Sequence, residues 1–281
     1  MSAAELPLVA GKMVGALLQV ELDGFFGLPE WLMIVLFLGV MTAACETGYR
    51  LGVRSRVGEK TQALVPIVAA SILGIMGLLL GFTMSMSVSR FDGRRLLVLN
   101  EANAIETAYL RAEALPPPES AEFQELIRQY AAARLRTSQG ALDPEKLRQG
   151  KQEGVRLQKE LWSRAAALGQ KDPHSVTAGL LMQSLNEVMD LENSRWILFV
   201  AHVPLGVLYV NALMGLVSAL LIGYDFGITG HRHALSEALL IVSIAMVMAV
   251  IVELDRPHSG VVRVSQRPLV ELQQRLAAPG H

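Results

Sequence analysis

Few residues in this sequence have the types and spacing that metal binding or catalysis requires. His233 and Glu237 lie four positions apart, so one helical face could present both to a metal ion. His231 does not share a helical face with His233, and no second histidine cluster completes a ligand set. Phosphate-binding loops, nucleophile elbows and paired catalytic acids are missing from the sequence, and one cysteine, Cys45, excludes a cysteine-based zinc site or internal disulfide. We therefore predict that the protein is not an enzyme and has no metal or cofactor.

Three glutamates form a second candidate set because each borders a long apolar stretch: Glu46, Glu237 and Glu253. A charge near the hydrocarbon boundary is costly and often functional, and Arg256 or Arg263 could supply the partner. Each glutamate could instead simply mark the end of a membrane helix.

Arg90, Arg94 and Arg95 follow directly after an uncharged stretch and form a third set. Arginines at the inner mouth of a pore attract anions. They could equally serve to anchor the membrane topology and to form salt bridges.

The candidate glutamates and arginines border uncharged stretches of the sequence, and the helices expected there would position them. Of 281 residues, 52% are hydrophobic and 18% are charged, and the mean hydropathy is +0.37. This balance argues against an ordinary soluble enzyme, and a net charge of −1 argues against a nucleic-acid-binding protein. Residues 61–89 and 196–224 each run for 29 residues without a charge, more than the roughly 20 that cross a hydrocarbon core as a helix. They predict two membrane spans.

Two shorter uncharged stretches flank the long ones, at residues 31–45 and 238–252. Each has 15 residues, about 22 Å of helix, which is too short to span unless an acidic end enters the interface. Spanning helices with such ends and re-entrant or interfacial segments are both possible, and we predict four spans. Before them, residues 1–30 form an N-terminal segment that could lie as a helix on the membrane surface.

Residues 90–195 are polar, with 15 basic and 15 acidic side chains. A packing seam recurs there every seven residues: Phe91, Val98, Ile105 and Ala112. The seam predicts that the second span continues into water as a helix and stops at the prolines of 116–118. Asp143 and Asp172 each precede a proline, a pattern typical of helix starts, and the last helix could pass into the third span at Trp196.

The predicted fold class is therefore all-α, an integral membrane protein with four transmembrane helices and a helical cytoplasmic bundle. The predicted domains are an N-terminal segment (1–30), a first transmembrane pair (31–89), the helical domain (90–195), a second transmembrane pair (196–254) and a C-terminal segment (255–281). Arginines gather after the second and fourth spans, on what must be one side, and the positive-inside rule makes that side cytoplasmic. Four basic residues before the second span oppose this orientation.

The second span carries a ribbon of small residues at helical spacing: Ala70, Gly74, Gly77, Gly81 and Ser85. Such a ribbon lets another helix approach closely in lipid. Alternatively, several copies of the span surround a pore that gates by dewetting. The pore-lining candidates are Gly74, Leu78, Phe82 and Ser85, and since none is charged, no selectivity filter is visible.

Two polar residues and an exit segment complete the candidates. Asn211 could form an interhelical hydrogen bond, and His202 is either a packed side chain or one that titrates or binds an ion. Pro257 predicts that the fourth span ends just before it, because proline disfavours helical geometry in the preceding residue. Gly260 then permits a turn, so the segment is either a latch between the soluble bundle and the membrane layer or a plain loop.

Three stretches resemble a bacterial membrane-protein family described as bestrophin-like: GFTMSMSVSRFDGRR (81–95), EANAIETAYLR (101–111) and LDRPHSGVVRVS (254–265). With the span layout, the resemblance covers most of the chain from the second span onward. Its motif residues include Glu101, Asn103, Tyr109, Arg111, Asp255, Arg256, Pro257 and Gly260. Glu106 departs from the family pattern, which prefers a small residue there.

The resemblance implies the architecture of bestrophins, which are pentameric ion channels that mostly pass anions. Their aromatic and aliphatic constriction is not matched residue by residue, since Phe82 is the one aromatic of the second span, and no acidic cluster resembles their calcium clasp. We predict an oligomeric ion channel, a pentamer by resemblance, in a bacterial inner membrane with both termini cytoplasmic. Its partners are the lipid bilayer, further copies of itself and inorganic ions, with no nucleic acid. The alternative is a non-conducting structural or sensory membrane protein whose helical bundle binds partners.

Overall fold

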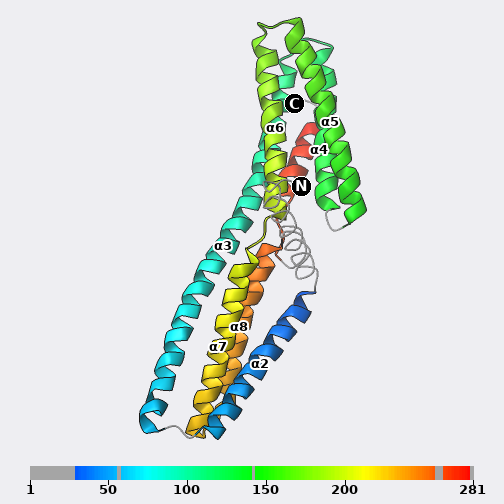
Figure 1. Ribbon diagram of the computed structural model, residues 1–281. Coiled ribbons are helices and arrows are strands. Elements are labelled where there is room, and N and C mark those ends of the chain that lie inside the picture. The colour runs from blue at the N-terminus through cyan, green and yellow to red at the C-terminus, as the bar shows by residue number, and fades with distance from the viewer. Residues whose placement is uncertain (1–28, 56–57, 141–142, 257–261, 279–281) are drawn as a thin grey trace, which may run out of the picture. The chain divides into compact units, whose positions relative to one another are not determined.

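The computed structural model describes residues 29–55, 58–140, 143–256 and 262–278, and every regular element in these ranges is a helix (Figure 1). The helices are α2 (Glu30–Arg54), α3 (Glu59–Glu113), α4 (Glu119–Gln139), α5 (Pro144–Lys171), α6 (Val176–Val200), α7 (Leu205–Thr229), α8 (Ala234–Asp255) and α9 (Arg267–Ala277). The predicted all-α fold is thereby confirmed. The predicted end of the fourth span just before Pro257 is confirmed, because α8 ends at Asp255 and Arg256 is extended. The predictions for the N-terminal segment, apart from the first residues of α2, and for Gly260 lie outside the described residues.

Four stretches are long and apolar enough to cross a membrane, which confirms the predicted number of spans: Trp31–Arg54, Gln62–Glu113, Val176–Thr229 (which comprises α6 and α7) and Ala234–Asp255. The two short uncharged stretches become full-length helices because the helix continues through the glutamates beside them. As a result α2 has 25 residues and α8 has 22, and about 33 Å of helix is sufficient for a hydrocarbon core.

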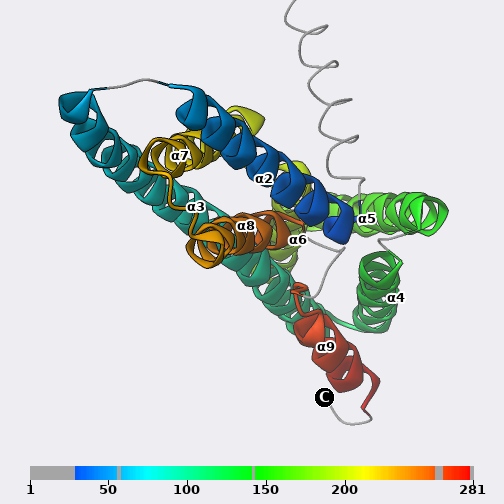
Figure 2. The same cartoon turned by 90° about the horizontal axis from the view of Figure 1, so that it is seen from below.

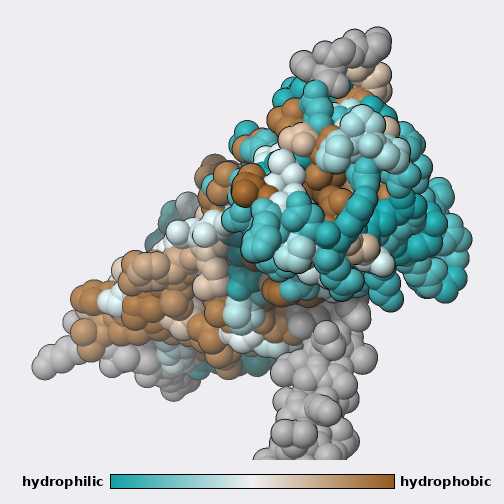
Figure 3. Space-filling model, turned by 90° about the horizontal axis from the view of Figure 1, so that it is seen from above, coloured by the Kyte–Doolittle hydropathy of each residue, from teal (hydrophilic) through white to brown (hydrophobic). Residues whose placement is uncertain are grey.

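The described residues fall into two compact units. We call residues 29–88 and 203–256 the membrane unit, and residues 89–202 and 262–278 the polar unit. Hydrophobic and hydrophilic residues accordingly gather in separate regions of the visible surface (Figure 3).

In the membrane unit, α7 packs against α2 and is also hydrogen-bonded to α3 (Figure 2). The α2–α7 contact runs through glycines at four-residue spacing, Gly48 and Gly52 on α2 and Gly223 and Gly227 on α7. A Cβ on Gly223 would overlap the Cys45 carbonyl, so the two backbones touch directly. Close contact of this kind replaces the hydrophobic drive that lipid cannot supply between helices.

In the polar unit, the second part of α3 packs with α4, α5, α6 and α9 around a single apolar core. The predicted seam lies in that core: Val98, Ile105 and Ala112 are buried, and Phe91 packs against them. The helix that bears the seam ends at Glu113, just before the prolines, as predicted.

Two predictions about helix ends have different outcomes. Asp143 caps α5 by accepting hydrogen bonds from the backbone N–H groups of Glu145 and Lys146, so the predicted start is confirmed. The predicted start at Asp172 is wrong, because the N-cap of α6 is Ser175, and Asp172 instead accepts a hydrogen bond from the His174 N–H in the turn before it. At its other end α6 stops at Val200, and α7 begins only at Leu205, so the two helices are not continuous.

The C-terminal helix α9 was not predicted. Leu269, Leu272 and Leu276 lie at three- and four-residue spacing on its buried face and join the core of the polar unit. The Arg128 guanidinium donates to the Leu276 carbonyl over 3.0 Å and so covers the end of the helix. The segment after the fourth span therefore binds the helical bundle.

Candidate functional site

The predicted pore face lies on the side of α3 that its own chain leaves open. A buried stripe runs along the opposite side: Ala69, Met76, Leu80, Thr83 and Ser87. Each pore candidate lies two positions from a residue of this stripe, about 200° around the helix. Leu78 and Phe82 are 60% and 65% exposed, and Gly74 and Ser85 are exposed as well.

The small-residue ribbon of α3 does not mediate packing within the described part of the chain. A Cβ on Gly74, Gly77 or Gly81 would meet nothing within 4 Å. In the membrane unit, glycines instead mediate the contact between α2 and α7. The ribbon thus leaves α3 open to a helix of another molecule or to lipid.

On its buried side, α3 is tied to α7 by the hydrogen bond that the sequence predicted for Asn211. The Asn211 Nδ2 donates to Thr83 Oγ1 over 2.8 Å and to the Val207 carbonyl over 2.9 Å. Ser218 adds a longer contact to the Met76 sulfur, 3.9 Å away. These bonds fix the rotation of α3 and therefore the direction of its open face. His202, the other polar candidate, lies in the break between α6 and α7.

Two of the three boundary acids meet at one arginine. Arg232 pairs with Glu46 over 3.0 Å and with Glu237 over 3.5 Å, and its guanidinium lies 5.2 Å from the centre of the Tyr49 ring. Glu46 also pairs with Arg50 over 2.8 Å. For Glu46 and Glu237 the partner is therefore Arg232, and the expected partner, Arg256 or Arg263, is wrong for these two.

His233 and Glu237, the possible metal-binding pair, each contact another residue. Glu237 faces Arg232, and the His233 ring packs edge-on against Phe226 with 5.8 Å between ring centres. Within the described residues, no three side chains of the metal-binding types gather around one point.

Of the three arginines after the second span, Arg94 is buried. Its Nε donates to the Leu198 carbonyl over 3.1 Å, and its Nη2 donates to the Ala201 carbonyl over 2.8 Å. These are carbonyls at the C-terminal end of α6, where the helix dipole favours a positive charge. Arg90 is half-buried and Arg95 is exposed, so these two arginines face outward from their helix more than Arg94 does.

Glu101 lies at the centre of a buried charge network in the polar unit. Its side chain is fully buried, and its carboxylate accepts hydrogen bonds from Arg134 on α4 and from Arg195 on α6. Arg134 Nη1 also donates to Glu192 over 2.9 Å, and Arg195 Nη2 donates to Ser138 and to Gln266 over 3.3 Å each. One carboxylate thus connects α3, α4, α6 and the C-terminal segment.

Glu192 is the second carboxylate of the network. It accepts hydrogen bonds from Arg134, from the Tyr130 hydroxyl over 3.2 Å and from Gln158. Burial raises the pKa of Tyr130, and Glu192 raises it further, so the phenol stays protonated and can donate. Burial alone would lower the pKa of Arg134, but the nearby charges of Glu101 and Glu192 raise it above its usual value. Arg134 therefore stays charged.

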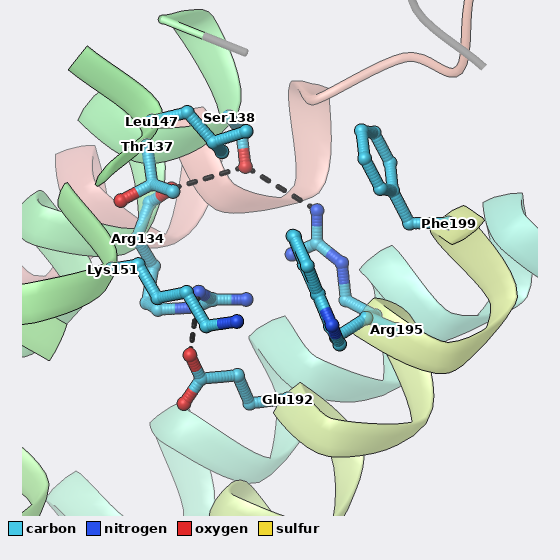
Figure 4. A pocket seen from close by; sticks show the side chains of 9 residues that line it. Arg134, Thr137, Ser138, Leu147, Lys151, Glu192, Arg195 and Phe199 are labelled. Atoms are coloured by element: carbon cyan, nitrogen blue, oxygen red, sulfur yellow. Dashed lines mark hydrogen bonds and ion pairs between the residues drawn. The ribbon is translucent and has the colours of Figure 1, made fainter. Parts of the chain in front are cut away.

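A cavity of about 90 Å³ opens beside this network, between α4, α5 and α6 (Figure 4). Its lining residues are Arg134, Thr137, Ser138, Leu147, Lys151, Glu192, Arg195, Trp196 and Phe199. The Lys151 ammonium lies 3.6 Å from the centre of the Trp196 ring, and Trp196 stacks on Phe199 with 5.5 Å between ring centres. The cavity is therefore basic on one side and aromatic on the other.

The remaining motif residues also make specific contacts. The Tyr109 hydroxyl accepts from Arg128 Nη2 over 2.7 Å, and Arg111 donates to the Leu180 carbonyl over 2.7 Å, whereas the Asn103 side chain is exposed. In the membrane unit, the buried Asp255 accepts a hydrogen bond from the Val203 N–H over 2.9 Å. Arg256 contacts the Met33 sulfur at 2.9 Å.

Comparison with known proteins identifies the family of this chain. The family model of the bestrophin-like domain matches residues 35–269. The chain belongs to the bestrophin-like family. No significant relative was found among curated proteins.

Crystal structures of a bacterial bestrophin homologue from Klebsiella pneumoniae share the bestrophin-like fold of this chain. The structure phased by Zn-SAD has a TM-score of 0.60 and 16% sequence identity, and the match covers 86% of this chain and 95% of that one. A variant of the homologue gives a TM-score of 0.60 and 17% identity, covering 88% and 97%. A further structure, described as a membrane protein, gives a TM-score of 0.62 and 16% identity, covering 88% and 98%.

The bestrophin-like stretches pointed to Glu101 but not to the groups around it. Arg134, Glu192 and Arg195 were missed because they lie 33 to 94 positions away from Glu101 along the chain or reach it through another residue. One local signal was present, since Glu101 lies three positions after Val98 and four before Ile105, on the buried face of a helix. A carboxylate at such a position requires a cationic partner.

Proposed function

We propose that this bestrophin-like protein is an oligomeric ion channel whose pore is lined by α3. The observation that carries the proposal is the open face of α3, formed by Gly74, Leu78, Phe82 and Ser85. One side of the helix is fixed to α7, and the other has no partner within the described residues. Copies arranged around an axis would turn this face inward.

The pore proposed here is narrow and apolar. Glycines without neighbours allow the helices to approach closely, and Leu78 and Phe82 would form the narrowest rings. Apolar rings gate by dewetting, so conduction depends on whether water fills the constriction. Because no pore candidate is charged, selectivity must come from elsewhere, and the outward-facing Arg90 and Arg95 favour anions near one end.

The assembly and location follow from the family resemblance. We propose a pentamer in a bacterial inner membrane, with both termini and the polar unit in the cytoplasm. The membrane unit supplies the spans, and the arginines after the second and fourth spans set the orientation.

Flux measurements on the purified protein test the proposal. The oligomer is first counted by native mass spectrometry, and chloride flux is then measured after reconstitution into liposomes. We expect flux in the wild type and a change in flux in Phe82→Ala, because the substitution widens the ring. Leu213→Ala is the matched control, since Leu213 on α7 is 61% exposed but lies outside the proposed pore face.

An intact oligomer without flux under any salt gradient contradicts the channel. That result favours the alternative function, a structural or sensory membrane protein whose polar unit binds partners. An equal change in Phe82→Ala and Leu213→Ala moves the constriction away from Phe82.

A further inference from the structure

More positive than negative side chains line the cavity between α4, α5 and α6. The channel proposal does not explain this excess. Arg134, Lys151 and Arg195 line it, and Glu192 is the one acidic residue of the lining. Behind them, Glu101 pairs with both arginines. Two carboxylates therefore face three cations, which leaves one positive charge.

Both carboxylates already accept hydrogen bonds from nearby donors. Glu101 accepts from two guanidinium groups, and Glu192 accepts from Arg134, Tyr130 and Gln158. The paired arginines largely neutralise the repulsion that the two carboxylates exert on an incoming anion.

The surplus cation is Lys151. Within the described part of the chain its ammonium has no carboxylate partner, and its one specific contact is the face of the Trp196 ring. That contact holds the ammonium at the cavity wall. The adjacent Arg134 uses Nε and Nη1 for the two glutamates, which leaves the donors of Nη2 for another acceptor. Figure 4 shows the side chains of Lys151 and Arg134 among those that line the cavity.

The size of the cavity limits the ligand. A volume of about 90 Å³ matches a small oxyanion rather than a nucleotide. The stacked rings of Trp196 and Phe199 form an apolar wall on one side. A phosphate or phosphomonoester group fits both the volume and the donors, because its several oxygens can each accept from a cation.

We propose that this cavity is a binding site for a small oxyanion of the phosphate class, held by Lys151 and Arg134 with Arg195 beside them. A bound oxyanion connects α5, through Lys151, to the network on α4 and α6. It therefore stabilises the polar unit.

Binding of inorganic phosphate to the full-length protein in detergent tests the proposal. Affinity is measured by isothermal titration calorimetry at constant ionic strength, with chloride as the replaced anion. We expect saturable binding of one phosphate per chain. Lys151→Met should weaken it at least tenfold, because the stem still packs on Trp196 while the charge is lost. Lys151→Arg should keep the affinity within about threefold of wild type.

Lys159→Met is the matched control, since Lys159 is also an exposed lysine of α5 and lies away from the cavity. It should bind phosphate like the wild type. Glycerol phosphate is titrated in parallel, and tighter binding than that of phosphate identifies a phosphomonoester as the preferred source of the group. Failure of phosphate to saturate, or equal affinity in Lys151→Met and wild type, overturns the proposal. None of these readouts depends on ion flux, so the channel proposal stands or falls separately.

Discussion

Replacing Glu101 by glutamine should destabilise the polar unit more than any other single change of charge in it. The substitution keeps the shape of the side chain but removes the buried negative charge that Arg134 and Arg195 share. Removing one partner of a buried ion pair costs about 3–5 kcal/mol, because the remaining charge stays buried and uncompensated. Glu192 still pairs with Arg134 in this variant, so Arg195 is the arginine that loses its carboxylate partner.

Hydrogen–deuterium exchange of the full-length protein in detergent measures this loss locally. A decrease of about 3–5 kcal/mol in opening free energy accelerates the exchange of protected amides in α4 and α6 by roughly two to three and a half orders of magnitude. Exchange in α2 and α7 of the membrane unit should change far less.

Glu106→Gln is the matched control on the same helix. Glu106 pairs with Arg275 over 3.0 Å, but the two side chains are 28% and 49% exposed, so the pair is worth only about 0–1 kcal/mol. If Glu101→Gln accelerates exchange no more than Glu106→Gln does, the buried network does not stabilise the unit and our reasoning about it is refuted.

Three further predictions concern packing, hydrogen bonding and pH. Gly223→Ala should abolish recovery of folded protein in detergent because the new Cβ would overlap the Cys45 carbonyl, whereas Gly74→Ala should leave recovery unchanged. Asn211→Ala should lower the free energy of unfolding by about 1 kcal/mol, measured as a lower melting temperature, and an unchanged value would mean that its interhelical bond contributes nothing. Hydrogen bonds from the backbone N–H groups of α5 lower the pKa of Asp143, so this cap stabilises the helix above pH ~4 and the stabilisation is lost as the pH falls through the lowered pKa. Circular dichroism should show the loss, and it should be smaller in Asp143→Asn.

Hydrophobicity and helical periodicity were sufficient to predict the elements of the fold. The uncharged stretches gave the spans, and the seam at Val98, Ile105 and Ala112 gave the continuation of α3 beyond the membrane unit. Both signals are local, because the residues that carry them lie within one helix.

Pairing between helices was harder to predict because it depends on which faces meet. The ribbon of α3 and the glycines of α2 and α7 are similar sequence signals, but only the latter form contacts within the chain. The pattern Gly48-xxx-Gly52 and its counterpart Gly223-xxx-Gly227 were both visible in the sequence. Their pairing required knowledge that α2 and α7 are neighbours.

The partners of the charged side chains were also hard to predict from the sequence. Glu46 and Glu237 were candidates near the membrane boundary, but their partner is Arg232, to which the sequence analysis gave no role. Glu106, the departure from the family pattern, meets Arg275 on α9, an 11-residue helix that we did not predict although its leucines follow a helical period. Partners that are distant in sequence are set by the fold, and a single sequence does not contain that information.

Cysteine accessibility along α3 tests the central claim, that this helix lines an ion pore, most directly. Cys45 is the one cysteine of the chain, so a Cys45→Ala background permits single-cysteine variants. A charged methanethiosulfonate reagent is applied to liposomes that contain Phe82→Cys or the control Leu213→Cys, and chloride flux is recorded before and after. A pore lined by α3 predicts that the reagent blocks flux in Phe82→Cys and leaves Leu213→Cys unchanged. Flux that persists in Phe82→Cys although labelling is complete would contradict it.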